Sequence, residues 1–457
     1  MYYIYNNTLP KRGQRGREMK KLLAPYSRVF KNTGILLSGN VVSKLINLFT
    51  LFLTARYLGT GNFGTLVFVQ TFVLIVITFV SFQPWQAIIN YGTRLSQEKD
   101  KKDFKLLISY GFFLDILSAI LGFILSLVFL QFFSHYFNFS EDVILYSSIY
   151  SVVILFYING TPTALLRIYD KFKLFAFQEI TTAIIKVILI AITCLLQGDL
   201  IHFVLVWVLT DIIADCLLMY FGFKEYSKRG NKFSLSFSFK EVNEKFKGIW
   251  QFVWMTNLQR TIKIIPNYLD IVMIQFLLGA NTVGIYKIAK SIAATVNGLA
   301  DPLYQAIYPQ LAKFWSGDDK NNFFGLIKVI GLIMGVIGVV GWLGIIVVGE
   351  QVIVLAMGLE YIDAYSVLVW YFLGVILSMV GLPIAPAMLS MGLVKQHLYI
   401  VSISSVLYLI VLYFSLLNFQ LAGAGIAYFI FYAIWLILYI IYFKSERKNF
   451  NEINQPN

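Results

Sequence analysis

The sequence predicts an all-α polytopic membrane protein, built from twelve transmembrane helices in two related halves. Of its 457 residues, 58% are hydrophobic and 13% are charged, and the mean hydropathy is +0.72. A water-soluble domain must cover its surface with polar groups, so it cannot accommodate this composition. The segment LGTGNFG at residues 58–64 recurs 220 residues later as LGANTVG at 278–284, each copy between apolar stretches. Two such halves usually move something through the interface between them.

The spans follow from the length of chain that crosses the hydrocarbon core, about 20 apolar residues. The seventh is long enough to tilt or bend, and we expect the bend at Pro266. The first residues lack the apolar core and cleavage site of a signal peptide, and Met19 is an alternative start. The predicted spans are 34–56, 63–90, 107–133, 143–166, 175–197, 200–222, 247–277, 283–309, 324–348, 364–390, 397–418 and 422–443.

Basic residues orient these spans. Thirty of the 37 Lys and Arg residues fall in the amino-terminal arm, in alternate loops and in the tail, while the other loops contain none except Arg56 at a span edge. Lys and Arg gather in cytoplasmic loops, so both termini are predicted to be cytoplasmic. The net charge of +13 is therefore mostly a consequence of topology, and no nucleic-acid partner is expected.

The loops also set the domain organisation and exclude some chemistry. The longest outer loop, 349–363, has no room for a catalytic domain, so no enzyme is expected. Cys194 and Cys216 lie in apolar spans and suggest packing, and the three histidines have no metal-ligand spacing, so neither a metal nor a cofactor is expected. The predicted parts are an arm (1–33), a six-helix bundle (34–222), a basic linker (223–246), a second six-helix bundle (247–443) and a tail (444–457).

Charged side chains also occur inside the predicted spans. A charge at the bilayer centre costs at least ~3 kcal/mol on insertion scales, so such residues usually face a cavity or a partner. The basic residues of this group are Lys44, Arg56, Lys186, Arg260, Lys263, Lys287 and Lys290, and the acids are Asp115, Asp211, Asp215, Asp270 and Asp301.

Polar residues recur at matching positions in the two halves. Spacings of three and four residues place such groups on one face of a helix. A shift of 220 residues superposes the polar face of span one on that of span seven, and one polar residue of span two on a lysine of span eight. These faces predict the walls of one central cavity. The matched residues are Asn40, Ser43, Lys44 and Asn47 in span one, Arg260, Lys263 and Asn267 in span seven, and Gln70 with Lys290.

Internal ion pairing is an equally good interpretation of some of these charges. At ~1.5 Å per residue, Asp270 and Lys290 lie at similar depth, as do Lys186 and Asp211. The two pairs could be structural, or their lysines could support a binding site.

Other charges are harder to assign to pairs. Asp115 could neutralise Lys44, and Arg56 is expected to extend to the outer interface. Arg260 and Lys263 lie in the middle of their span, and few acids remain to match them. We therefore expect both to face an aqueous cavity that accepts anions.

Several short fragments carry a resemblance to a known family: ARYLG at 55–59, FG at 63–64, Asp270, Gly279, VGIY at 283–286, YP at 308–309, LA at 311–312 and GLEY at 358–361. In their order and spacing over residues 28–443, they resemble the polysaccharide-biosynthesis (Wzx-type) flippases of the MOP transporter superfamily. The first fragment departs from the common pattern at Thr60, where proline is frequent.

The resemblance implies a MATE-like fold, with two six-helix bundles related by a pseudo-two-fold axis along the membrane normal. It also implies translocation of a polyprenyl-diphosphate-linked oligosaccharide across the bacterial cytoplasmic (inner) membrane, for O-antigen or capsule. Glycan polymerase and chain-length proteins would be its partners, and the bundles would rock about the cavity.

The residues suit that activity. Arginine makes bidentate contacts with phosphate, while lysine supplies a point charge. We therefore expect Lys44, Arg260 and Lys263 to attract the anionic head group, with Lys290 and Lys186 supporting them.

Coupling to an ion gradient is a further hypothesis. Asp211 and Asp215 lie one turn apart on span six, where a cation or proton could load, and Asp270 is another candidate. Neutralisation of Lys186 is an equally good interpretation of Asp211 and Asp215.

Two other functions compete with the flippase. A multidrug or cation antiporter of the same superfamily would need carboxylates facing an apolar cavity, and Arg260 and Lys263 argue against it. A membrane glycan polymerase would need a large outer loop with clustered Arg, His or carboxylate groups, which this chain lacks.

Overall fold

The computed structural model describes residues 27–95, 101–137, 139–231, 233, 235, 237–262, 264–298 and 301–453. All regular secondary structure in these residues is helical, as the composition predicts. The helices of the first half are α2 (Ser27–Val80), α3 (Pro84–Leu95), α4 (Lys101–Phe133), α5 (Glu141–Phe156), α6 (Gly160–Ile168), α7 (Phe172–Leu195), α8 (Leu200–Ser227) and α9 (Phe239–Lys245).

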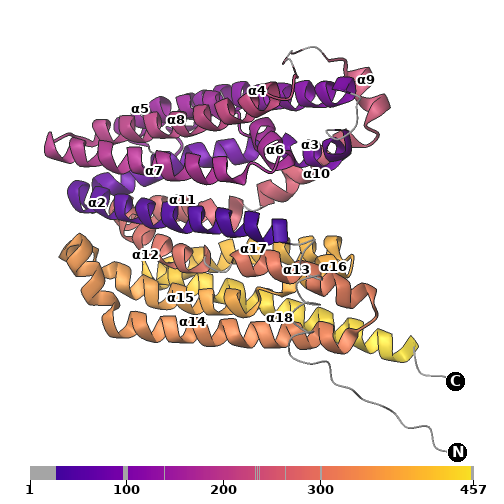
Figure 1. Ribbon diagram of the computed structural model, residues 1–457. Helices are drawn as coiled ribbons and strands as arrows, with labels where there is room; N and C mark the ends of the chain where they lie inside the picture. The colour runs from indigo at the N-terminus through magenta and orange to yellow at the C-terminus, as the bar shows by residue number, and fades with distance from the viewer. Residues whose placement is uncertain are drawn as a thin grey trace, which may run out of the picture.

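The second half contains the remaining helices. Figure 1 shows α4 to α8 on one side of the molecule and α14, α15 and α18 on the other, with α2, α11 and α12 between them. The elements are α10 (Ile249–Ile262), the π-helical turn η2 (Ile265–Leu269), α11 (Asp270–Leu278), α12 (Ala280–Gly298), α13 (Asp301–Ser316), α14 (Lys320–Met357), the 3-10 turn η3 (Leu359–Tyr361), α15 (Asp363–Val380), α16 (Ile384–Ser390), α17 (Val394–Phe419) and α18 (Ala422–Ile453).

The helices account for twelve crossings. Ten segments of the described chain are long and apolar enough to span a membrane, and one of them, Val41–Val80, is broken at Gly59 into the first two predicted spans. Helix α12 has 19 residues, or about 28 Å at 1.5 Å per residue, and provides the eighth crossing. Lys287 and Lys290 lower its hydropathy. The predicted twelve-helix all-α fold is confirmed.

The sequence repeat marks two equivalent backbone breaks. Gly59 has φ 71° and ψ 172°, and Gly279 has φ 83° and ψ 177°. Residues with a Cβ rarely adopt this conformation, so glycine is needed where one helix ends and the next begins at once. We call the end of the molecule that carries these breaks the turn end.

The two copies of the repeat pack against each other reciprocally. A Cβ on Gly64 would overlap the carbonyl oxygen of Ala280, and a Cβ on Gly284 would overlap that of Thr60, both closer than real Cβ atoms come. Each half thus offers a glycine to the turn of the other. This arrangement is what a pseudo-two-fold axis through the contact requires.

Three hydrogen bonds join the halves at the same end. Arg56, which is exposed as predicted, donates to the carbonyl oxygens of Leu355 at 3.0 Å and Ala356 at 3.5 Å, in the last turn of α14. The Tyr361 hydroxyl donates to the Ala55 carbonyl oxygen at 2.9 Å. The last carbonyls of a helix lack partners within it, so Arg56 satisfies groups that α14 leaves open.

The predicted bend of the seventh span is confirmed. Pro266 lies in the π-helical turn between α10 and α11. Proline has no N–H to donate and displaces the carbonyl one turn earlier, which explains the local widening.

Helix α10 packs on the first half. Ile249 and Val253 are fully buried in a cluster with side chains of α3, α4 and α6. Asn257 donates to the carbonyl oxygens of Ser81 at 2.8 Å and Phe79 at 3.3 Å, at the end of α2. The seventh crossing therefore begins on one half and, beyond the π-helical turn, continues as α11 beside the other.

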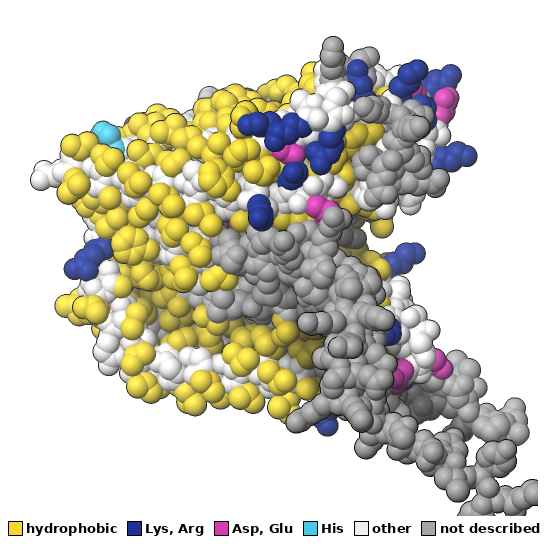
Figure 2. Space-filling view, in the orientation of Figure 1, with side chains coloured by type: hydrophobic (Ala, Val, Ile, Leu, Met, Phe, Trp, Pro, Cys, Tyr) yellow, Lys and Arg dark blue, Asp and Glu magenta, His cyan; other side chains and the backbone are white. Residues whose placement is uncertain are grey.

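The surface matches a membrane environment. Figure 2 shows hydrophobic side chains along the flank of the molecule, with Lys and Arg mostly toward the end where α9 and α16 lie in Figure 1. Apolar flanks are favourable only where lipid, rather than water, covers them.

Candidate functional site

A cavity of about 430 Å³ lies among α2, α7, α8 and α12. We call it the lysine cavity, because Lys44, Lys186 and Lys287 all line it. Helices of both halves contribute to its walls, as the matched polar faces predict. Its other polar lining residues include Asn47, Gln70, Thr182, Thr210, Asp211, Ser291 and Thr295.

One further cavity adjoins it, and a third adjoins the second. The aromatic cavity, of about 550 Å³, has Lys44 and Lys290 on one side and side chains of α15, α17 and α18 on the other. The arginine cavity, of about 280 Å³, contains Arg260. Lys44 lines the first two cavities and Asn267 lines the last two, so the three form one polar region.

Lys186 forms the ion pair that the sequence suggested. Its ammonium lies 3.5 Å from an Asp211 carboxylate oxygen and 4.3 Å from the centroid of the Trp207 ring. Tyr150 donates to the other Asp211 oxygen at 2.5 Å, and Gln70 donates to Tyr150 at 3.3 Å. The network fixes both charges at the cavity wall.

Lys290 forms the second predicted pair. Asp270 is fully buried, and its carboxylate accepts from Lys290 and from the Tyr286 hydroxyl, each at 2.5 Å, and from the backbone N–H of Ile271 at 2.8 Å. Lys290 also donates to the Asn267 carbonyl oxygen at 2.8 Å. That carbonyl belongs to the π-helical turn, so the bend gives the lysine a second acceptor.

Arg260 extends from α10 toward the first half. Its guanidinium donates to the hydroxyls of Ser81 and Tyr157, each at 3.2 Å. Both hydroxyls belong to the first half, so these contacts hold the guanidinium against that half.

Lys44 reaches the carboxyl end of α12, where a Cβ on Gly298 would overlap its ammonium. The expectation that Asp115 neutralises Lys44 was wrong. Asp115 instead accepts hydrogen bonds from the backbone N–H groups of Gly160 at 3.2 Å and Thr161 at 2.7 Å. The first amides of a helix lack partners within it, and Asp115 satisfies those of α6. Lys44 interacts electrostatically with Glu179 of α7, an acid that the sequence analysis overlooked.

The structure describes most of the other predicted residues. Asp215 is buried and accepts a hydrogen bond from Asn159 at 2.9 Å. Lys263 lies outside the described residues, as do the side chains of Asn40 and Asp301. Among the described residues, no cluster of His, Cys, Asp and Glu is suited to hold a metal.

Lys287 was not among the predicted binding residues. It lines the lysine cavity together with Lys186 of the other half and lies one turn before Lys290 on α12. Its position three residues before Lys290 was the available signal, because that spacing places two lysines on one face.

The family described as "Polysaccharide biosynthesis protein" matches residues 29–315. "Inner membrane protein YghQ" of Escherichia coli (strain K12) is 26% identical over 343 residues, which cover 75% of this chain and 96% of the relative. "Putative O-antigen transporter" of Shigella dysenteriae is 22% identical over 314 residues, or 64% and 72% of the two chains.

Solved structures agree with the fold. An inward-facing multidrug resistance MATE family transporter of the MOP superfamily has a TM-score of 0.76 at 12% identity, covering 90% of this chain and 96% of that one. The lipid II flippase MurJ, in an inward closed conformation, has a TM-score of 0.72 at 16% identity, covering 90% and 87%. With this MATE-like fold and a match over more than half its length, the chain belongs to the polysaccharide biosynthesis protein family.

Proposed function

We propose that this protein is a flippase for a polyprenyl-diphosphate-linked oligosaccharide in the bacterial cytoplasmic membrane. The observation that carries the proposal is Lys287, which lines the lysine cavity from α12 opposite Lys44 and Lys186 of the first half. Lys186 and Lys290 each pair with an aspartate, whereas no described acid forms an ion pair with Lys287, so a polyanion in the lysine cavity would supply the missing opposite charge. A diphosphate has the required charge.

The family and the relatives support the same substrate class. The family is one of polysaccharide biosynthesis, and one relative is named as an O-antigen transporter. The flipped product would pass to glycan polymerase and chain-length proteins, and the surface polymer would be an O-antigen or a capsule.

Transport would proceed by alternating access. We propose that both termini are cytoplasmic, so that the turn end faces outward and is closed by the contacts around Gly64 and Gly284. The rocking units would be the bundles 34–222 and 247–443, joined by the linker 223–246. The substrate would enter the lysine cavity from the cytoplasmic side and leave when those contacts open.

Lys287→Gln tests the proposal. In the source bacterium lacking this gene, we expect lipid-linked saccharide to accumulate and surface polymer to disappear until the wild-type gene is returned. Loss of one charged contact with phosphate removes about 1.5–3 kcal/mol, so the Gln variant should lower the polymer export rate at least tenfold. Lys287→Arg should retain most of it.

The matched control is Lys395→Gln, which removes an exposed lysine at the start of α17. It should leave polymer export unchanged. Normal export by the Lys287→Gln variant, at equal protein level, would contradict the cationic site. A deletion strain that accumulates no lipid-linked saccharide would contradict the flippase itself.

The antiporter alternative is less well supported. A cationic drug needs carboxylates that face the cavity, whereas Asp211 and Asp270 each pair with a lysine. We therefore retain it only as the alternative that drug-efflux measurements would test.

Ion coupling through Asp211 and Asp215 is a separate prediction. With Asp211→Asn and Asp215→Asn combined, we expect gradient-driven transport in proteoliposomes to stop, because the site loses both negative charges, while substrate binding persists. Asp142→Asn, at an exposed position on α5, is the control. Transport that still responds to an imposed gradient in the double variant would assign the pair a structural role.

A further inference from the structure

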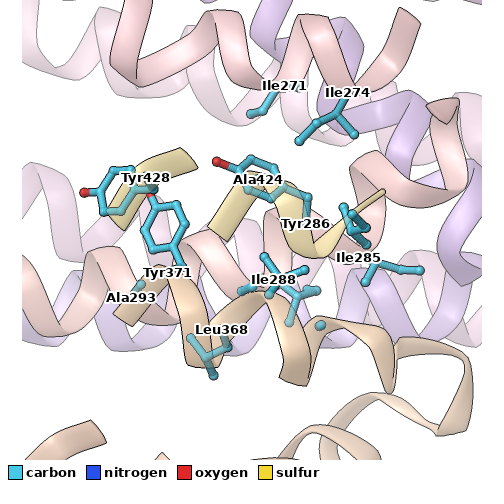
Figure 3. Close-up of a cluster of buried hydrophobic side chains, with 14 of the residues drawn as sticks. Ile271, Ile274, Ile285, Tyr286, Ile288, Ala293, Leu368, Tyr371, Ala424 and Tyr428 are labelled. Atoms are coloured by element: carbon cyan, nitrogen blue, oxygen red, sulfur yellow. The ribbon is translucent and has the colours of Figure 1, made fainter. Parts of the chain in front are cut away.

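The aromatic cavity has a wall that the diphosphate does not explain. Tyr428, Phe431, Tyr432 and Trp435 line it from α18, at spacings that place them on one face of the helix. Tyr371 of α15 extends the wall, with its ring stacked on Tyr428 at a centroid distance of 3.7 Å and an angle of 10° (Figure 3).

Glycines of α15 make room for this wall. A Cβ on Gly374 would lie 2.6 Å from a ring carbon of Tyr428, and one on Gly381 would overlap the indole of Trp435. Tyr371 and Tyr428 are nearly buried, with 4% and 8% of their surface exposed, and they form the base of the wall. Tyr432 and Trp435 are half-buried and line the same cavity.

The same cavity also offers neutral polar groups. Asn267, Asn297 and Ser378 line it together with Lys44 and Lys290. An isoprenoid chain in this space would cover amide and hydroxyl groups without bonding them, which is unfavourable. A sugar ring has an apolar C–H face for an aromatic ring and hydroxyls for the amides.

We propose that the aromatic cavity binds the saccharide portion of the substrate, with Tyr432 and Trp435 against the faces of the sugar rings. The proposal rests on the flippase function above. Lys44 lines both this cavity and the lysine cavity, so a diphosphate at Lys44 would place its first sugar at the entrance of the aromatic cavity.

The test compares two ligands on the purified full-length protein in nanodiscs. One is the lipid-linked saccharide extracted from the source bacterium lacking this gene, and the other is polyprenyl diphosphate without sugar. The wild type should bind the saccharide-bearing lipid more tightly. Trp435→Leu should weaken that binding about tenfold and leave the sugar-free lipid unaffected, because only stacking is lost.

Two variants control for packing. Trp435→Tyr keeps an aromatic ring and should restore most of the saccharide binding. Trp370→Leu makes the same kind of substitution on α15 at a side chain that is 42% exposed, and it should change neither affinity.

Each other outcome overturns the proposal. Equal wild-type affinity for the two lipids would mean that the sugar makes no contact. Equal weakening of both by Trp435→Leu would assign the cavity to the lipid chain or to folding. Absence of binding of either lipid to the wild type would overturn the flippase function as well, whereas Lys287→Gln should weaken both lipids if the diphosphate site is correct.

Discussion

Gly64→Ala is expected to force the two halves apart at the turn end. The added Cβ would overlap the backbone carbonyl of Ala280, which cannot rotate away as a flexible side chain could. Overpacking of a close contact typically costs about 1–3 kcal/mol. Gly284→Ala meets the Thr60 carbonyl in the same way and should have the same effect. We expect a lower melting temperature and a loss of transport for both variants.

The controls for this prediction lie on α14. Gly325→Ala and Gly344→Ala place a Cβ where no heavy atom lies within 4 Å, so neither should reduce the melting temperature. A thiol probe at Asn62→Cys, an exposed position beside the contact, should react faster when Gly284→Ala is added. Unchanged melting and unchanged thiol reactivity would show that the contact does not hold the halves together.

Asp270→Ala is expected to destabilise the second half strongly. The carboxylate is fully buried and bonded to Lys290, Tyr286 and the backbone of Ile271. Removal of one member of a buried ion pair typically costs about 3–5 kcal/mol, because the other charge is left uncompensated. Thermal unfolding of the purified protein should show this as a large fall in melting temperature.

A double-mutant cycle separates the pair from its surroundings. Lys290→Met alone should also destabilise, whereas Asp270→Ala with Lys290→Met should cost less than the sum of the two. Asp142→Ala, an exposed acid on α5, is the matched control and should have little effect. Additive single effects would mean that Asp270 and Lys290 do not stabilise each other.

Much of the fold could be predicted because it depends on patterns within short stretches of the sequence. The spans follow from apolar length, the bend from Pro266, and the paired turns from the repeat around Gly59 and Gly279. The two ion pairs also followed, since equal depth along helices brings Asp270 to Lys290.

The rest depends on packing that linear patterns do not encode. Asp115 was expected to neutralise Lys44, but it binds the open backbone amides at the start of α6. The start of α6 lies inside a predicted span. Arg260 belongs by sequence to the second predicted bundle, yet α10 packs on the first half and places Arg260 in contact with that half. In the sequence, the aromatic residues of α18 indicated only an apolar span. No local pattern distinguishes a ring that packs in the core from a ring that lines a cavity.

The reciprocal glycine contact has a consequence for how the chain can change. In a symmetric dimer of identical subunits, one substitution alters both sides of an isologous interface at once. Here the two sides are fused in a single chain, so Gly64 and Gly284 mutate separately, and each new side chain meets an unaltered partner. Gln70 and Lys290, which the 220-residue shift superposes, line two different cavities, so a change at one does not meet the other. The contact between the halves therefore requires glycine at both positions, whereas the cavity walls can differ from one half to the other.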